Sequence, residues 1–221
     1  LDRRRKDKKV SHRQCKSQPD PDRRILNLKD GRTHLAYKAE HAVDLDSDLV
    51  LAASVYHADE TDSETIQSTL TETQDHLIAA ESDANPTEVV GDKGYYKHET
   101  IGELEFTEGV RTYIAEPKQQ GRCLSKTQPS EQRRAVRNNR RRIEGARGRR
   151  LQRKRSEMVE RSFAHVCGTG GARRTHLRGI GKVRKRHLIA AAAHNLGVIM
   201  RALFGFGTPR ALQGLRRQLR V

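Results

Sequence analysis

The sequence predicts a mixed α/β fold in which a sheet is flanked by helices. Apolar residues are concentrated in three stretches, 33–58, 86–116 and 187–206, although only 34% of the whole chain is hydrophobic. Within these stretches, short apolar runs typical of strands alternate with longer runs that have helical periodicity. The resulting order of elements is strand, strand, helix, strand, helix, strand, which is typical of α/β proteins.

An antiparallel hairpin is predicted for the first stretch. Residues 33–43 alternate between apolar and polar side chains, as in a strand with one buried face. Residues 49–56 (LVLAASVY) form a continuous apolar run, as in a strand buried on both faces. A cluster of aspartates that begins at Asp44 makes the turn between them. A shorter strand at 25–28 comes before this hairpin, because Asp30-Gly31 favours a tight turn.

The middle of the chain continues with a helix, a strand, a second helix and a second strand. The helix over 62–82 begins at an Asp-Ser-Glu sequence, which favours a helix N-terminus. The next strand begins at Glu88 and delivers Asp92 at its C-terminal end, before a glycine turn. A short helix at 98–106 and a strand at 109–114 complete this part.

Helical segments are predicted after Pro129. Residues 130–144 have helix-forming composition and a nearly continuous arginine surface, which we expect to be solvated or to lie along phosphates. Glycines 145 and 148 interrupt it, and a further helix starts near Gln152. The last helix covers 183–203, and its predicted inward side chains are Leu188, Ala192, Asn195, Ile199 and Leu203. We interpret its apolar run as a buried helix rather than a membrane span, because it contains polar and charged residues.

The charge of the chain indicates an anionic partner. The formal net charge is +16, and arginine far outnumbers lysine between residues 122 and 187. Arginine binds phosphate through a planar, bidentate fork, so nucleic acid fits this composition better than a membrane surface. A structural basic protein of ribosomal type would explain the charge, but not an acid at a strand end and a second acid on a helix. The three cysteines are far apart and form no CxxC motif, and the chain opens with charged residues rather than a signal peptide, so we expect a cytoplasmic protein.

Two acids stand out against this basic background. Asp92 follows a strand, and strand ends are where an α/β sheet presents functional groups. Glu160 lies beside an apolar helical stripe formed by Val159, Phe163 and Val166, close to several arginines. Each also has an ordinary interpretation, as a turn residue and as a solvated helix charge. Two carboxylates from separate elements suit Mg²⁺ or Mn²⁺, which take oxygen ligands and can support phosphoryl transfer.

Four segments together resemble the C-terminal catalytic part of an insertion-sequence DDE transposase. They are LKDGRTHLAYKAEHAVD at 28–44, VVGDKGYY at 89–96, RTYIAEPK at 111–118 and VERSFAHVCGTGGARRTHLRG at 159–179. The resemblance runs from about Asp20 to Arg210. It implies an RNase H-like sheet in which three acids, in the order Asp, Asp, Glu, bind two divalent metal ions. Asp92 matches the second Asp of this set and Glu160 matches the Glu.

The first Asp of the family pattern has no clear counterpart in this sequence. In the family it lies on the first, central strand, upstream of Asp20. Asp44 is the one substitute we consider, but its Ala-Val-Asp context matches a different strand. We therefore expect a truncated copy whose sheet lacks the first central strand and has two unpaired strand edges.

The resemblance also implies a domain arrangement and a function. We expect a basic lead-in at 1–23, a catalytic domain at 24–206 with an Arg-rich insertion at 118–155, and a basic tail at 207–221. The expected activity is metal-dependent cleavage and joining of DNA strands at the ends of the element, by a homodimer at the nucleoid. The alternative is an inactive remnant that still binds nucleic acid. The predicted phosphate-binding residues are Arg140, Arg141, Arg142, Arg173, Arg174 and Arg178.

Overall fold

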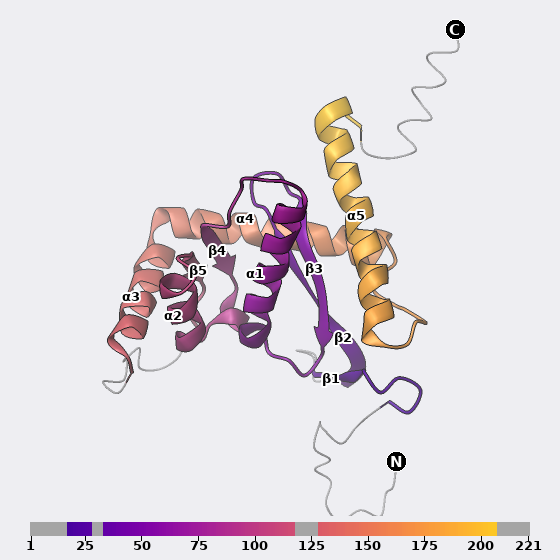
Figure 1. Ribbon diagram of the computed structural model, residues 1–221, viewed down its shortest axis with the longest axis horizontal. Coiled ribbons are helices and arrows are strands. Elements are labelled where there is room, and N and C mark those ends of the chain that lie inside the picture. The colour runs from indigo at the N-terminus through magenta and orange to yellow at the C-terminus, as the bar shows by residue number, and fades with distance from the viewer. Residues whose placement is uncertain (1–16, 28–32, 118–127, 207–221) are drawn as a thin grey trace, which may run out of the picture.

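The computed structural model describes residues 17–27, 33–117 and 128–206 (Figure 1). The strands are β1 (Arg24–Asn27), β2 (Thr33–Val43), β3 (Val50–His57), β4 (Glu88–Gly91) and β5 (Arg111–Ile114). The α-helices are α1 (Asp62–Ala79), α2 (His98–Phe106), α3 (Ser130–Glu144), α4 (Ala146–Phe163) and α5 (Ile180–Phe204). A short 3-10 helix, η1 (Lys93–Tyr95), follows β4, and a π-helical segment, η2 (Ala164–Thr169), continues α4. This order confirms the predicted mixed α/β class.

The described strands form two sheets, and one edge of β2 and one edge of β4 have no described neighbour, as expected for a sheet that lacks a central strand. β1, β2 and β3 form an antiparallel sheet in that order, while β4 and β5 form a parallel pair. No described strand connects β2 to β4. The arrangement is consistent with an RNase H-like sheet that is open in its middle. The predicted turn at Asp30-Gly31 lies outside the described residues.

One hydrophobic core lies where α1, α2 and α3 meet β5. Its fully buried side chains are Ile101 and Leu104 on α2, Ile114 on β5, and Ala135 and Val136 on α3. Their burial fixes α3 on the molecule, and of the arginines on its surface Arg140 and Arg142 are half-buried and paired within the domain, whereas Arg134, Arg137 and Arg141 are exposed. The helix buries its few small and apolar side chains and leaves most of its arginines at the margin.

A second, smaller core lies between β3, η2 and α5. Val50, Ala53, Val166 and Ala191 are buried there. Val166 is fully buried, as the apolar stripe predicted.

The prediction for the inward face of α5 was wrong at three positions. Its buried residues are His187, Ala191 and His194. Ala192 is exposed, and Ile199 and Leu203 are exposed by 43% and 69%. The C-terminal half of α5 projects beyond the sheet, so no described element covers it (Figure 1). By length and composition alone α5 could cross a membrane, but its N-terminal half packs against β3 as a domain helix does.

Helix α4 crosses both sheets and links them (Figure 1). Near its start, Gln152 Nε2 donates to the carbonyl oxygens of Gly91 and Tyr113, at 2.9 and 2.6 Å. Near its end, Ser162 contacts β2. The helix break falls at Gly145, whereas Gly148 lies within α4 and does not interrupt it as predicted. A Cβ atom at Gly148 would come within 2.2 Å of the Arg142 carbonyl oxygen, so glycine permits the close turn between α3 and α4.

Candidate functional site

A groove runs between β2 and β4. It consists of two neighbouring cavities of about 800 and about 320 Å³, which share His41, Ala42, Leu70, Val90 and Val159 among their lining residues. Helix α1 forms one wall and α4 forms the other. The strand-end acid predicted from the sequence lies at one end of this groove.

Asp92 follows β4 directly and lines the narrower cavity. Its Oδ1 accepts a hydrogen bond from the Gly94 backbone N–H at 2.6 Å, which caps η1. Among the described residues, none donates a hydrogen bond to its Oδ2. The carboxylate is thus held by its own turn, and one oxygen remains available to a ligand.

Polar side chains from β2 and α1 meet at the same end of the groove. Lys38 Nζ lies 2.8 Å from Asp62 Oδ1, at the start of α1. A Cβ atom at Gly94 would come within 2.2 Å of Asp62 Oδ2 and 3.1 Å of Asp92 Oδ1, so two carboxylates flank this glycine. Burial raises the pKa of Tyr95, and the nearby carboxylates, including Asp62 and Asp92, raise it further.

A buried glutamate on β2 completes this cluster. Glu40 is 4% exposed and accepts hydrogen bonds from Thr65 Oγ1 and Thr69 Oγ1, both at 2.6 Å. Neither Glu40 nor Lys38 was predicted to have a role, and Asp62 was predicted only as part of a helix start. One sequence signal could have found them. Lys38 and Glu40 lie on the same face of β2, whose other face is largely apolar, and charged residues in a buried strand usually have partners.

Glu160 lies on the exposed side of α4. Its Oε1 accepts a hydrogen bond from Ser156 Oγ at 2.9 Å. Its neighbours Val159 and Phe163 line the narrower cavity together with Asp92, but Glu160 itself does not. The two predicted acids therefore come from two elements that border the same groove, and of the two only Asp92 lines it.

The donor chemistry of these two residues suits a hard divalent cation. Carboxylate oxygens are preferred ligands of Mg²⁺ and Mn²⁺, and Mg²⁺ usually keeps several of its waters. Within residues 17–27, 33–117 and 128–206, no group of three or more His, Cys, Asp or Glu side chains is arranged to hold a metal ion. Asp92 and Glu160 fit such an ion as individual ligands, but the described residues do not assemble a complete site around them.

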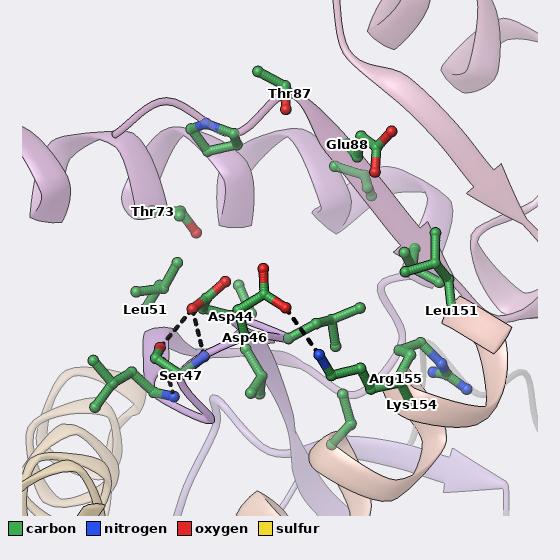
Figure 2. A pocket seen from close by; sticks show the side chains of 18 of the residues that line it. Asp44, Asp46, Ser47, Leu51, Thr73, Thr87, Glu88, Leu151, Lys154 and Arg155 are labelled. Atoms are coloured by element: carbon green, nitrogen blue, oxygen red, sulfur yellow. Dashed lines mark hydrogen bonds and ion pairs between the residues drawn. The ribbon is translucent and has the colours of Figure 1, made fainter. Parts of the chain in front are cut away.

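Asp44, the substitute considered for the first acid, lies at the other end of the groove. Its Oδ2 accepts hydrogen bonds from the Ser47 backbone N–H and side-chain hydroxyl, which closes the turn after β2 (Figure 2). Asp46, in the same turn, pairs with Lys154 of α4 at 2.9 Å. The structure thus gives Asp44 the role of a turn residue, remote from the Asp92 end.

A buried pair of histidines lies behind the groove. Ser162 Oγ donates to the Val159 carbonyl, so it accepts a hydrogen bond from His41 Nδ1–H at 2.8 Å. His41 Nε2 must then accept from His187 Nε2–H, also at 2.8 Å. Burial, followed by the neighbouring His187 and His194, lowers the pKa of His41 to about 3. Both rings are therefore neutral near pH 7, and they join β2 to α4 and α5.

The predicted phosphate-binding arginines fall into two groups. Arg140 pairs with Glu116 at 2.7 Å, and Arg142 bonds to the Thr112 carbonyl and Glu105, so both are half-buried and engaged within the domain. The other four are exposed, namely Arg141, Arg173, Arg174 and Arg178. Helix α4 adds exposed arginines at positions that were not singled out, which are Arg147, Arg149, Arg150 and Arg153.

Comparison with protein families accounts for this combination of fold, strand-end acid and basic surface. Residues 11–196 match the Transposase DDE domain. The chain belongs to the DDE transposase family. This confirms the family resemblance seen in the sequence, over most of the chain. Among curated proteins and among solved structures, no match was found.

Membership of this family gives the groove a context. DDE transposases act on DNA and use phosphoryl-transfer chemistry with divalent metal ions. In this DDE domain the groove has an acid at one end and an arginine-bearing helix along one side.

Proposed function

We propose that this chain carries the catalytic part of an insertion-sequence transposase that cuts DNA at the element's ends and joins the 3′ ends to a target. Asp92 and Glu160 are the proposed catalytic carboxylates. The observation that carries the proposal is the match to the DDE domain, together with Asp92 at the end of β4 facing a groove flanked by the helix that carries Glu160.

Each acid has a defined task in this proposal. Asp92 and Glu160 hold Mg²⁺ or Mn²⁺ as ionised oxygen ligands. The bound ion would activate the attacking oxygen and stabilise the leaving oxygen during in-line displacement at phosphorus. The Gly94 N–H holds Asp92 Oδ1, so Oδ2 is directed by a fixed turn rather than by a flexible loop. Exposed arginines on α4 and after η2 would position the DNA backbone.

Cleavage and metal binding test these roles separately. Nicking of supercoiled plasmid and cleavage of duplexes carrying the element's ends are measured with Mg²⁺ or Mn²⁺, and Mn²⁺ binding is measured by calorimetry. Asp92→Asn and Glu160→Gln should each abolish cleavage and weaken Mn²⁺ binding at least tenfold. Glu157→Gln is the matched control, because Glu157 is an exposed acid on the same helix that pairs with Arg161.

Comparison of Glu160→Gln with Glu157→Gln decides whether Glu160 belongs to the proposed site. Equal cleavage by Glu160→Gln and Glu157→Gln would remove Glu160 from the proposed site. Loss of cleavage without loss of Mn²⁺ binding would give Glu160 a role other than metal ligation.

A second function, nucleic-acid binding without catalysis, is favoured by one observation. The described residues display exposed arginines on α4 but do not group three metal-binding side chains. Binding of a labelled DNA duplex should then weaken steeply with salt, with a log–log slope of about −0.9 per neutralised phosphate. Salt-dependent binding with no cleavage in either metal would support this function over the first.

Two further features belong to the proposal. We place the protein in the cytoplasm, at the nucleoid, where its substrate lies. We also propose that two copies act together on DNA, because two element ends must be joined in one event. A dimer that forms with DNA but not without it, in sedimentation experiments, would support this.

A further inference from the structure

One face of α5 carries large apolar side chains that the described residues leave exposed. The helix packs against β3 and η2 through its opposite face, where His187, Ala191 and His194 are buried. The exposed face continues into the C-terminal half of α5, which stands clear of both sheets (Figure 1). Its members are Ile189, Ala192, Ala193, Leu196, Ile199, Leu203 and Phe204.

The spacing of these side chains is typical of a helix that pairs with another helix. Ile189, Leu196 and Leu203 follow one another at intervals of seven residues, and Ala192 and Ile199 lie between them at the fourth position of each heptad. Apolar residues at these positions form the contact seam of a two-helix coiled coil. We call these five residues the α5 stripe. Single exposed apolar residues are common on protein surfaces, whereas a continuous stripe of them indicates a partner.

The stripe is complementary to itself when two copies of α5 run in opposite directions. If Leu196 lies on a two-fold axis, Ile189 of one copy meets Leu203 of the second copy. On the same axis, the small Ala193 meets the large Ile199. Each contact is repeated on the other side of the axis, as the interface of a symmetric dimer requires.

Charge favours this antiparallel direction over a parallel one. Lys182 and Lys185 are exposed and continue the face of Ile189 towards the start of α5. In a parallel pair these lysines would face their own copies and repel them. In an antiparallel pair they approach the end of the other α5 at Gly205, where the last backbone carbonyls carry partial negative charge.

DNA and a membrane fit the stripe less well than a second copy does. Between Leu188 and Phe204 the sequence has one charged residue, Arg201, so the stripe itself has no cations that could bind phosphate. A helix that spans a membrane must be free of its domain over its whole length, whereas the N-terminal half of α5 packs against β3.

We propose that two copies of this chain associate through α5 as an antiparallel helix pair centred on Leu196. One helix pair buries less than the roughly 1,600 Å² of a standard interface, and each copy has a net charge of +16, so the dimer is weak. Free chains at low micromolar concentration are therefore mostly monomers. The stripe gives the two copies proposed to act on DNA a surface on which to meet. The inference does not rest on that proposal, because apolar pairing needs neither DNA nor metal.

Sedimentation velocity of the DNA-free chain tests the proposal. The chain should change from monomer to dimer between about 1 and about 200 µM. Raising the salt from about 0.15 M to about 0.5 M should lower the Kd about threefold, because salt screens the repulsion between like-charged chains. A dimer bridged by contaminating nucleic acid would respond in the opposite way, because phosphate contacts weaken with salt.

A charge at the centre of the stripe provides the matching variant. Leu196→Asp sets two carboxylates against each other on the axis, so it should raise the Kd at least tenfold. Ile78→Asp is the control, because Ile78 is an equally exposed apolar residue near the end of α1, at 64% against 58% for Leu196. This control should dimerise like the natural chain. Circular dichroism should show the same fold for both variants.

The direction of pairing is tested by mixing two variants. Ile189→Asp and Leu203→Lys should each raise the Kd about fivefold. An equimolar mixture should recover most of the natural affinity, because the antiparallel pair brings the new carboxylate next to the new ammonium group. In a parallel pair these two positions lie about 20 Å apart, and the mixture would gain nothing.

Three results would overturn the proposal. They are a monomer at every concentration, equal dimerisation of Leu196→Asp and the natural chain, and no recovery in the mixture of variants. Binding to phosphatidylcholine vesicles without a dimer in solution would assign the stripe to a membrane instead. If Leu196→Asp fails to fold, the salt dependence of the natural chain and the mixture of variants still decide the question. Failure here leaves the cleavage and metal-binding tests unaffected, because those use separate residues.

Discussion

At each of the two outer strand edges of the molecule, an asparagine side chain forms hydrogen bonds with an edge residue, but the two asparagines have different surroundings. On β5, the Asn139 side chain of α3 bonds to the Ile114 N–H and carbonyl, both at 2.9 Å. On β3, the Asn195 side chain of α5 bonds to the Val50 N–H and carbonyl, both at 2.8 Å. In each case one amide side chain satisfies both peptide groups of an edge residue, as a neighbouring strand would.

The difference lies in what surrounds each asparagine. Asn139 is 1% exposed and lies over the closed core of α2, α3 and β5. Asn195 is half-buried, and the helix beyond it exposes Leu196 by 58% and Leu203 by 69%. The α3 end is therefore held by packing as well as hydrogen bonds, whereas the α5 end depends on fewer buried contacts. Substitutions at matched positions should separate the two ends.

The largest contrast is expected from leucines at the two ends. Leu104→Ala should lower the free energy of unfolding by about 2–5 kcal/mol, because Leu104 is fully buried and its removal leaves a cavity. Leu196→Ala should change it by less than about 0.5 kcal/mol, because that side chain is already largely in water. Urea unfolding measures both. Similar losses for the two variants would show that α5 is covered in solution.

Substitutions of the two asparagines should show the same order, with the larger loss of stability at the α3 end. Asn139→Leu keeps a similar volume but leaves the Ile114 N–H and carbonyl buried without partners, at a cost of about 2–4 kcal/mol. Asn195→Leu should cost about 1–2 kcal/mol, because Asn195 is only half-buried and its two hydrogen bonds are less enclosed than those of Asn139. Equal losses in urea unfolding would mean that the two edges are equally enclosed.

The sequence predicted the bounds of the helices and strands better than it predicted which side of each one is buried. The bounds of β2, α2 and α3 agree with the prediction, because alternation, helical periodicity and Pro129 are local signals. The inward face of α5 was wrong because the apolar and small residues of this 25-residue helix offer more than one stripe, and the choice depends on where β3 ends. Asn195 was placed inward correctly, but its bonds to Val50 require a partner 145 residues away.

The residues of the site could likewise be predicted only where the signal is local in the sequence. Asp92 was found from its position after a strand, which is a local signal. Lys38 and Asp62 meet near it only because β2 and α1 pack together, and nothing in the spacing of these residues shows that contact. The roles of Arg140 and Arg142 also depended on distant partners, since Glu116 follows β5 and Glu105 lies on α2. The catalytic assignment of Asp92 and Glu160 stays a prediction until the variants are measured.

Acid should weaken the α5 end through its buried histidines. The pKa of His41 is about 3 in the folded chain, against about 6.5 when unfolded, so the unfolded state binds more protons between these values. Stability is therefore full above pH 6.5 and falls as the pH drops towards 3. From pH 7 to 5 the loss attributable to His41 should be on the order of 2 kcal/mol.

Urea unfolding at several pH values measures this loss as a slope. His41→Asn should flatten the slope between pH 7 and 5, whatever its effect on stability at pH 7. His176→Gln, which alters an exposed histidine after η2, is the control and should keep the natural slope. An unchanged slope in His41→Asn would show that other groups cause the acid sensitivity.

The smallest effect is expected from Arg184, which adds one more bond to the outer edge of β3. Its Nη2 donates to the Val55 carbonyl at 3.1 Å, but the side chain is otherwise exposed. Arg184→Met keeps the aliphatic contact and removes the donor, so it should cost about 0.5 kcal/mol. Lys185→Met, at an exposed neighbouring position, is the control and should have no measurable effect in urea unfolding. A loss of stability from Arg184→Met as large as that from Asn195→Leu would mean that side-chain hydrogen bonds stabilise this edge along its whole length rather than at Val50 alone. The two outer edges would then differ less than their surroundings indicate.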